Sequence, residues 1–133
     1  MASPSLTPSV ARYIVPIVKA DNLKGHLDTL ILSVLERAPL HGYAVIAELK
    51  RRSGGELTLA EGTVYPALHR LEDAGLLTSA WSNVDGRRRR VYRLSRRGLR
   101  ELQGGRNEWH RFAAVVDSVL APAAMASGSG GME

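Results

Sequence analysis

The amino-acid sequence predicts a mainly α-helical fold with one small β-hairpin, in the order three helices, hairpin and long final helix. Apolar residues recur at helical spacing in three segments between Leu23 and Ala74. Two alternating runs then flank Asp85-Gly86, a pair that supplies the positive φ angles of a tight hairpin turn. A last apolar repeat continues to Leu120. With 133 residues, 44% of them hydrophobic, the chain suffices for one domain with a modest core.

The first two helices are predicted from their apolar faces. The first shows the i, i+3, i+4, i+7, i+8 spacing of an amphipathic helix at Leu27, Leu30, Ile31, Val34 and Leu35, and Ala38-Pro39-Leu40 ends it. The second runs from about His41 to Arg52, where Ser53-Gly54-Gly55 stops it. Its inward residues are Val45, Ile46 and Leu49. At its start we expect His41 to be a buried, hydrogen-bonded side chain.

The third helix lies within Ala60–Ala74 and has two candidate starts. Its buried stripe consists of Val64, Ala67, Leu68 and Leu71. Thr58–Glu61 has the form of a capping box, but a helix starting there would place Pro66 beyond its first turn. A cap at Gly62 or Thr63 puts Pro66 in the first turn at little cost, so we favour the later start.

The hairpin is predicted from two strands, Leu76–Asn83 and Arg88–Leu94. The alternation allows one face of the hairpin to carry Leu77, Trp81, Tyr92 and Leu94. The final helix is capped by Ser95 and runs to about Leu120. Apolar and small residues recur along it at spacings of three and four, weakened near Gly104-Gly105: Leu102, Gly105, Trp109, Phe112, Val116 and Val119. This coiled-coil-like seam favours a homodimer formed through the final helix.

Composition restricts the class of protein. The chain has no cysteine, no apolar run long enough to span a membrane and no signal-peptide pattern at its start, so we expect a cytoplasmic protein without a membrane partner. The four histidines lack zinc-ligand spacing, and no phosphate-binding glycine loop or catalytic triad stands out. We therefore expect no catalytic residues, metal or cofactor. The ends are rich in Ser, Pro, Gly and Ala, which predicts disorder in residues 121–133 and in part of 1–22. Within the latter, Arg12–Lys19 is either a short helix or a strap on the core.

The charge pattern favours a polyanionic partner. The formal net charge is +5, and eight arginines lie within the fourteen residues Arg87–Arg100 without one Asp or Glu. A hairpin carrying several guanidinium groups suits contacts to DNA phosphates, although a basic surface without a partner is the plainer interpretation. No Trp, Phe or Leu is expected at the hairpin tip, which disfavours a membrane surface. The outward face of the third helix carries His69 and Asp73, with Tyr65 and Arg70 at its flanks.

Together these elements predict a winged helix-turn-helix in residues 23–94 and a dimerisation helix in 95–120. In such a fold the hairpin is called the wing. The chain resembles the PadR-like transcriptional regulators in three runs that precede this wing: Leu23-Lys24-Gly25-His26-Leu27, Leu40-His41-Gly42-Tyr43 and Glu61–Leu71. The wing Gly86–Ser95 is also similar to that of the family. Gly104-Gly105 and the long N-terminal extension depart from the family pattern.

This resemblance implies a bacterial or archaeal regulator, usually a repressor, that binds inverted repeats of double-stranded DNA as a dimer. It implies that Tyr43 contacts the phosphate backbone. It places on the recognition helix Thr63, Tyr65, Pro66, His69 and Arg70. The wing residues expected to contact DNA are Arg87, Arg88, Arg89 and Arg90. The short members of the family dimerise through the final helix, here through Leu102, Trp109, Phe112, Val116 and Val119.

Two alternatives stay open at this stage. Trp109 is either a core or dimer-seam residue, or part of a flat slot in which two copies bind a small aromatic effector. The whole domain is alternatively a protein–protein module, in which the basic wing binds an acidic partner and DNA is bound only non-specifically.

Overall fold

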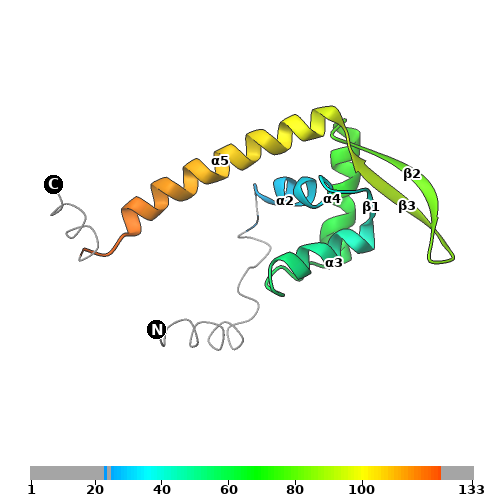
Figure 1. The fold of residues 1–133 in the computed structure, drawn as a ribbon, viewed down its shortest axis with the longest axis horizontal. Helices are drawn as coiled ribbons and strands as arrows, with labels where there is room; N and C mark the ends of the chain where they lie inside the picture. The colour runs from blue at the N-terminus through cyan, green and yellow to red at the C-terminus, as the bar shows by residue number, and fades with distance from the viewer. Residues whose placement is uncertain (1–22, 24, 124–133) are drawn as a thin grey trace. The chain divides into compact units, whose positions relative to one another are not determined.

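The computed structural model describes residue 23 and residues 25–123 (Figure 1). In this part of the chain the elements are α2 (Leu27–Val34), β1 (Leu40–His41), α3 (Gly42–Arg52), α4 (Glu61–Asp73), β2 (Leu77–Val84), β3 (Arg87–Leu94) and α5 (Arg96–Leu120). The predicted fold class, mainly helical with a small hairpin, is confirmed. The predictions for residues 1–22, including Arg12–Lys19, and for residues 124–133 lie outside the described residues.

One aliphatic core joins the helices to the base of the hairpin. Its largest fully buried side chains are those of Ile31, Leu32, Val45, Val64, Leu68, Leu71, Leu77 and Leu102. Each such side chain contributes about 1.5–3 kcal/mol through removal of apolar surface from water. Tyr92 is the aromatic residue among the buried core residues. The apolar stripes predicted for α2, α3 and α4 therefore all face this core.

The sheet has three strands rather than the two predicted. β1 pairs antiparallel with β3, with Leu40 opposite Tyr92 and His41 opposite Val91, so the order is β1-β3-β2. The prediction ended one helix at Leu40 and began the next near His41. A two-residue strand shows no alternation of its own, and only its partner identifies it.

The hairpin turn forms as predicted. Asp85 and Gly86 have φ angles of 52° and 75°, the two positive values of a type I′ turn. The strands pair from Leu77 opposite Leu94 to Val84 opposite Arg87, which extends the predicted second strand by one residue.

The later start favoured for the third helix is wrong. α4 begins at Glu61 with Ala60 as N-cap, and Pro66 lies inside the helix. Thr58 forms no capping box, since its hydroxyl donates to the Gly55 carbonyl at 2.8 Å. Proline at this position leaves the Gly62 carbonyl without its helical donor, but Gly62 and Pro66 are exposed and water can replace that bond. This exposure explains why the early start is tolerated.

The final helix starts at the predicted cap. The Ser95 hydroxyl accepts the Gly98 N–H at 2.9 Å and donates to the Gly75 carbonyl at 2.8 Å. α5 remains helical through Gly104-Gly105, so the glycine pair weakens the apolar repeat without interrupting the helix.

Candidate nucleic-acid interface

The start of α3 is held by His41. Its Nδ1 accepts the Ala44 N–H at 3.3 Å, which confirms the predicted hydrogen-bonded side chain, here half-buried as the N-cap. Burial, and then the nearby charge of Arg89, lower the pKa of His41 below its usual value. The neutral ring that can accept this bond is therefore favoured. Two residues further on, the Tyr43 side chain is 56% exposed and therefore accessible from solvent.

Tyr65 is less exposed than its predicted position on the flank of α4 indicated. It is half-buried and packs against the core, and its ring lies against Gly42 at the start of α3. Burial, followed by the charge of Glu61, raises the pKa of Tyr65. Tyr65 thus fixes α4 against α3 and presents only part of its ring to solvent.

The other predicted residues of α4 lie on its outer side. Pro66, His69 and Arg70 are exposed and Thr63 is half-buried. Arg70 donates to Asp28 of α2 at 2.9 Å, and this bond raises the pKa of Arg70. Both side chains are largely exposed, so the ion pair adds little stability and the guanidinium remains exchangeable with a phosphate.

The strand register divides the four wing arginines between the two faces of the hairpin. Arg87 and Arg89 lie opposite Val84 and Ser82, whereas Arg88 and Arg90 lie opposite Asn83 and Trp81 on the face that continues from the core. The charge of Arg89 acts on both His41 and Tyr65, so its side chain lies near the starts of α3 and α4. Its Nε is buried and has no hydrogen-bond partner among the described residues.

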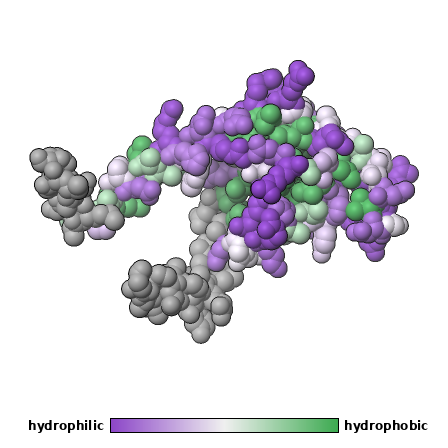
Figure 2. All heavy atoms as spheres, viewed as in Figure 1, coloured by the Kyte–Doolittle hydropathy of each residue, from purple (hydrophilic) through white to green (hydrophobic). Residues whose placement is uncertain are grey.

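Trp81 does not belong to the core. It shares a face with Leu77 and Tyr92 as predicted, yet it is 54% exposed because it lies further out on the hairpin. The guanidinium carbons of Arg88 and Arg90 lie 5.1 and 5.5 Å from the centre of its ring. Trp81 is thus an exposed aromatic residue on the strand, three residues before the turn, while the tip itself carries no Trp, Phe or Leu, as expected. Figure 2 shows hydrophilic side chains interspersed with apolar ones over the hairpin.

Glu72, which the sequence did not single out, links α4 to the hairpin. Its carboxylate accepts the Ser79 hydroxyl at 2.6 Å and lies 3.6 Å from the Arg90 guanidinium. Burial, followed by the charge of Glu72, raises the pKa of Tyr92 beside this pair. The sequence alone could have suggested an ion pair between Glu72 and the arginine-rich strand. The strand register was needed to show that Arg90 is the arginine concerned.

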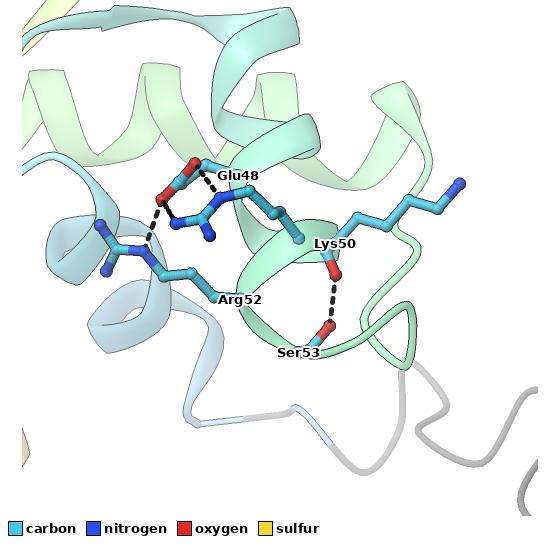
Figure 3. Close-up of polar contacts among 5 residues, drawn as sticks. Glu48, Lys50, Arg52 and Ser53 are labelled. Carbon is cyan, nitrogen blue, oxygen red and sulfur yellow. Dashed lines mark hydrogen bonds and ion pairs between the residues drawn. The ribbon is translucent and has the colours of Figure 1, made fainter. Parts of the chain in front are cut away.

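A second group of cations closes α3, where Lys50, Arg51 and Arg52 form its last turn. Glu48 accepts hydrogen bonds from Arg51 and Arg52, each at 2.7 Å, and these bonds lower the pKa of Glu48 to about 2 (Figure 3). The Ser53 hydroxyl donates to the Lys50 carbonyl at 3.1 Å. Cations at this end also favour the helix dipole. These contacts show that the three cations serve to end α3. The wing is therefore the strongest basic surface in the described part of the chain.

The predicted dimer seam changes at one end. Leu102 is fully buried in the core and has no surface to offer a partner. Further along α5, Trp109 is 47% and Phe112 54% exposed, with ring centres 6.0 Å apart. Val116 is half-buried, and the exposed apolar residues also include Val115, Val119 and Leu120. Figure 2 shows apolar side chains on this helix. None of the helices within residues 25–123 is long and apolar enough to cross a membrane.

This architecture defines the class of protein. A helix-turn-helix of α3 and α4, a basic hairpin and a long last helix make a winged helix-turn-helix of the kind that binds DNA. The particular family follows from comparison, since residues 31–104 match the "Transcriptional regulator PadR-like family". The chain belongs to this family, whose members are transcriptional regulators and not enzymes.

Similar proteins support the assignment. The transcriptional regulator Rv3488 of Mycobacterium tuberculosis is 42% identical over 77 residues, which cover 58% of this chain and 69% of the relative. A PadR family transcription regulator from Clostridium difficile R20291 has a similar structure, with a TM-score of 0.64, 36% identity and coverage of 72% of this chain and 99% of that one. A PadR family regulator from Eggerthella lenta gives a TM-score of 0.65 at 31% identity and covers 91% of this chain and 97% of its own.

Proposed function

We propose that this regulator binds a specific, inverted-repeat DNA site as a homodimer and acts as a repressor. The observation that carries the proposal is the cluster of Tyr43, the outer side of α4 and the arginine wing in one compact unit. In a winged helix-turn-helix, α4 enters the major groove and the wing contacts the adjacent backbone. Membership of the PadR-like family supports repression. Such a protein works where the DNA is, in the cytoplasm.

The partner proposed for α5 is a second copy of the same helix. Trp109, Phe112 and Val116 continue an apolar repeat of three and four residues, which is the pattern of a helix that packs on another. Val119 extends the repeat, and Val115 and Leu120 widen the exposed apolar surface. A dimer places two recognition helices about 34 Å apart, one turn of DNA.

Trp109 is also the proposed contact for a small aromatic effector. Its exposed ring and that of Phe112 supply the flat apolar surface that such a ligand needs. An aromatic ligand that releases the protein from DNA should quench tryptophan fluorescence, and Trp109→Ala should abolish that part of the quenching.

Selection of genomic DNA fragments by the purified protein, followed by salt titration, tests the proposal. Tyr65→Ala or His69→Ala should weaken binding to the selected site by about 1–3 kcal/mol and random DNA much less. Arg89→Ala should weaken both and reduce the salt slope by about 0.9 for each phosphate that its guanidinium no longer neutralises.

Two outcomes would contradict this assignment. Equal losses of affinity on both DNAs for Tyr65→Ala would remove it from base recognition. Weak binding without a selected motif would favour the alternative function, a winged helix whose basic hairpin binds an acidic protein.

A further inference from the structure

The outer half of the hairpin lacks the apolar core that supports its base. From Ala80 to Asn83 the side chains of β2 are exposed, and the core ends near Leu77 and Tyr92. A two-stranded ribbon alone is marginally stable in water, so it depends on side-chain pairs across the strands. The contacts that such a segment makes therefore decide whether it is ordered.

On one face of this segment a continuous series of contacts runs outward from α4. Glu72 lies 3.6 Å from Arg90, whose guanidinium lies over the Trp81 ring, and Arg88 lies over the same ring nearer the turn. Ser79 also anchors Glu72 to β2 at 2.6 Å. We call Glu72, Arg90, Trp81 and Arg88 the arginine–tryptophan ladder.

The ladder explains an aromatic residue that neither the core nor the helix-turn-helix requires. An exposed arginine side chain loses rotamer entropy of about 2 kcal/mol when it is fixed on a phosphate. A ring beneath the guanidinium restricts those rotamers before DNA arrives and leaves N–H groups at its edge that can donate to a phosphate. In Arg90 one terminal nitrogen already faces Glu72, so this role falls to its other N–H groups. Arg87 and Arg89 lie on the opposite face of the hairpin and have no such ring contact among the described residues.

We propose that Trp81 is a positioning residue for DNA binding, which orders Arg88 and Arg90 along one face of the wing and ties that face to the end of α4 through Glu72. The inference rests on the proposed function, because the ordered arginines are taken to meet DNA phosphates. Trp81 itself acts through the two arginines and not by contacting the duplex.

The experiment compares full-length variants in salt titrations on the selected site and on random DNA. Trp81→Ala should weaken both complexes about threefold per wing and leave the salt slope unchanged, because no cation is removed. Trp81→Phe keeps a ring and should recover part of the affinity. Arg88→Ala should weaken binding and also reduce the slope, by about 0.9 per wing.

Ser82→Ala is the matched control, since Ser82 is the next residue of β2 and lies opposite Arg89 on the other face. It should bind like the wild type. Wild-type affinity for Trp81→Ala would overturn the proposal, as would a reduced slope for Trp81→Ala or an unchanged slope for Arg88→Ala.

Hydrogen exchange without DNA separates this inference from the proposed function. Backbone amides between Ala80 and Arg90 should exchange faster in Trp81→Ala than in Ser82→Ala, with the protection of α4 unchanged. Equal exchange in the two variants would show that Trp81 does not order the wing. A wild-type protein that binds no DNA would refute the proposed function, whatever the exchange result.

Discussion

Gly42 carries the contact between the first helix of the helix-turn-helix and Tyr65 of the second, so Gly42→Ala is the sharpest test of how these helices are held. Gly42 is buried at the first position of α3. A β-carbon added there would lie 2.9 Å from Tyr65 Cζ and 3.0 Å from Cδ1, and closer still to Cε1. Real β-carbons do not approach heavy atoms so closely, so the ring or the helix must move.

The expected cost follows from this overlap. Overpacking a well-packed site by one methyl group typically costs about 1–3 kcal/mol. The Tyr65 ring packs against the core and is not the free end of a flexible side chain, so we expect about 2 kcal/mol and a decrease in Tm of roughly 5–10 °C. Because the displaced ring belongs to the proposed DNA-binding surface, affinity for the selected site should fall as well.

A double-mutant cycle with Tyr65→Ala measures this interaction by urea unfolding. In the Tyr65→Ala background the Gly42→Ala cost should largely disappear, since the obstructing ring is gone. Gly62→Ala is the control: a β-carbon there meets nothing within 4 Å, and replacing helical glycine with alanine should stabilise by up to about 1 kcal/mol. A Gly42→Ala variant as stable as the wild type, or equally destabilised in both backgrounds, would refute the packing argument.

Two further predictions concern the α3 cap and the proposed dimer. The folded-state pKa of His41 lies below its unfolded value near 6.5, so the unfolded state takes up the proton first. The stability that the neutral cap contributes is fully present above that value and is lost as the pH falls through the folded-state pKa. Urea unfolding between pH 8 and pH 5 should show this loss, and His41→Asn, which keeps a cap acceptor without titrating, should lack it. Phe112→Asp and Val116→Asp should each sediment as a monomer, because a charge at an apolar seam loses its hydration without gaining a partner. An aspartate at the exposed His110 should leave the dimer intact, and a dimer that survives both seam changes would show that these residues are outside the interface.

The sequence predicted most of the fold because its local signals agree with the tertiary structure. The Asp85-Gly86 turn, the Ser95 cap and the apolar faces of the helices all formed as their chemistry requires. The errors lie where a distant partner decides. β1 forms only because β3 is beside it, and α4 begins early because the exposed Gly62 carbonyl tolerates Pro66.

In the candidate DNA-binding site, too, the local signals were predictable from the sequence and the contacts between distant residues were not. Strand alternation alone already separates Arg88 and Arg90 from Arg87 and Arg89, yet their contacts with Trp81 required knowing where the core ends. Tyr65 was expected to be exposed because helical periodicity describes only the helix that carries it. Its partial burial comes from the contact of its ring with Gly42, which belongs to α3.

The final helix shows why a repeat does not identify its own partner. Leu102 and Val119 occupy the same apolar repeat, but Leu102 is buried in the core of its own chain while Val119 is largely exposed. An apolar repeat predicts that one face of a helix is covered. It does not predict whether the same chain or a second copy covers that face. The buried end stabilises the fold of one chain, so an aspartate at Leu102 should unfold the monomer. The same change at Phe112 should leave the monomer folded and remove only association, and this difference separates the two roles of one helix.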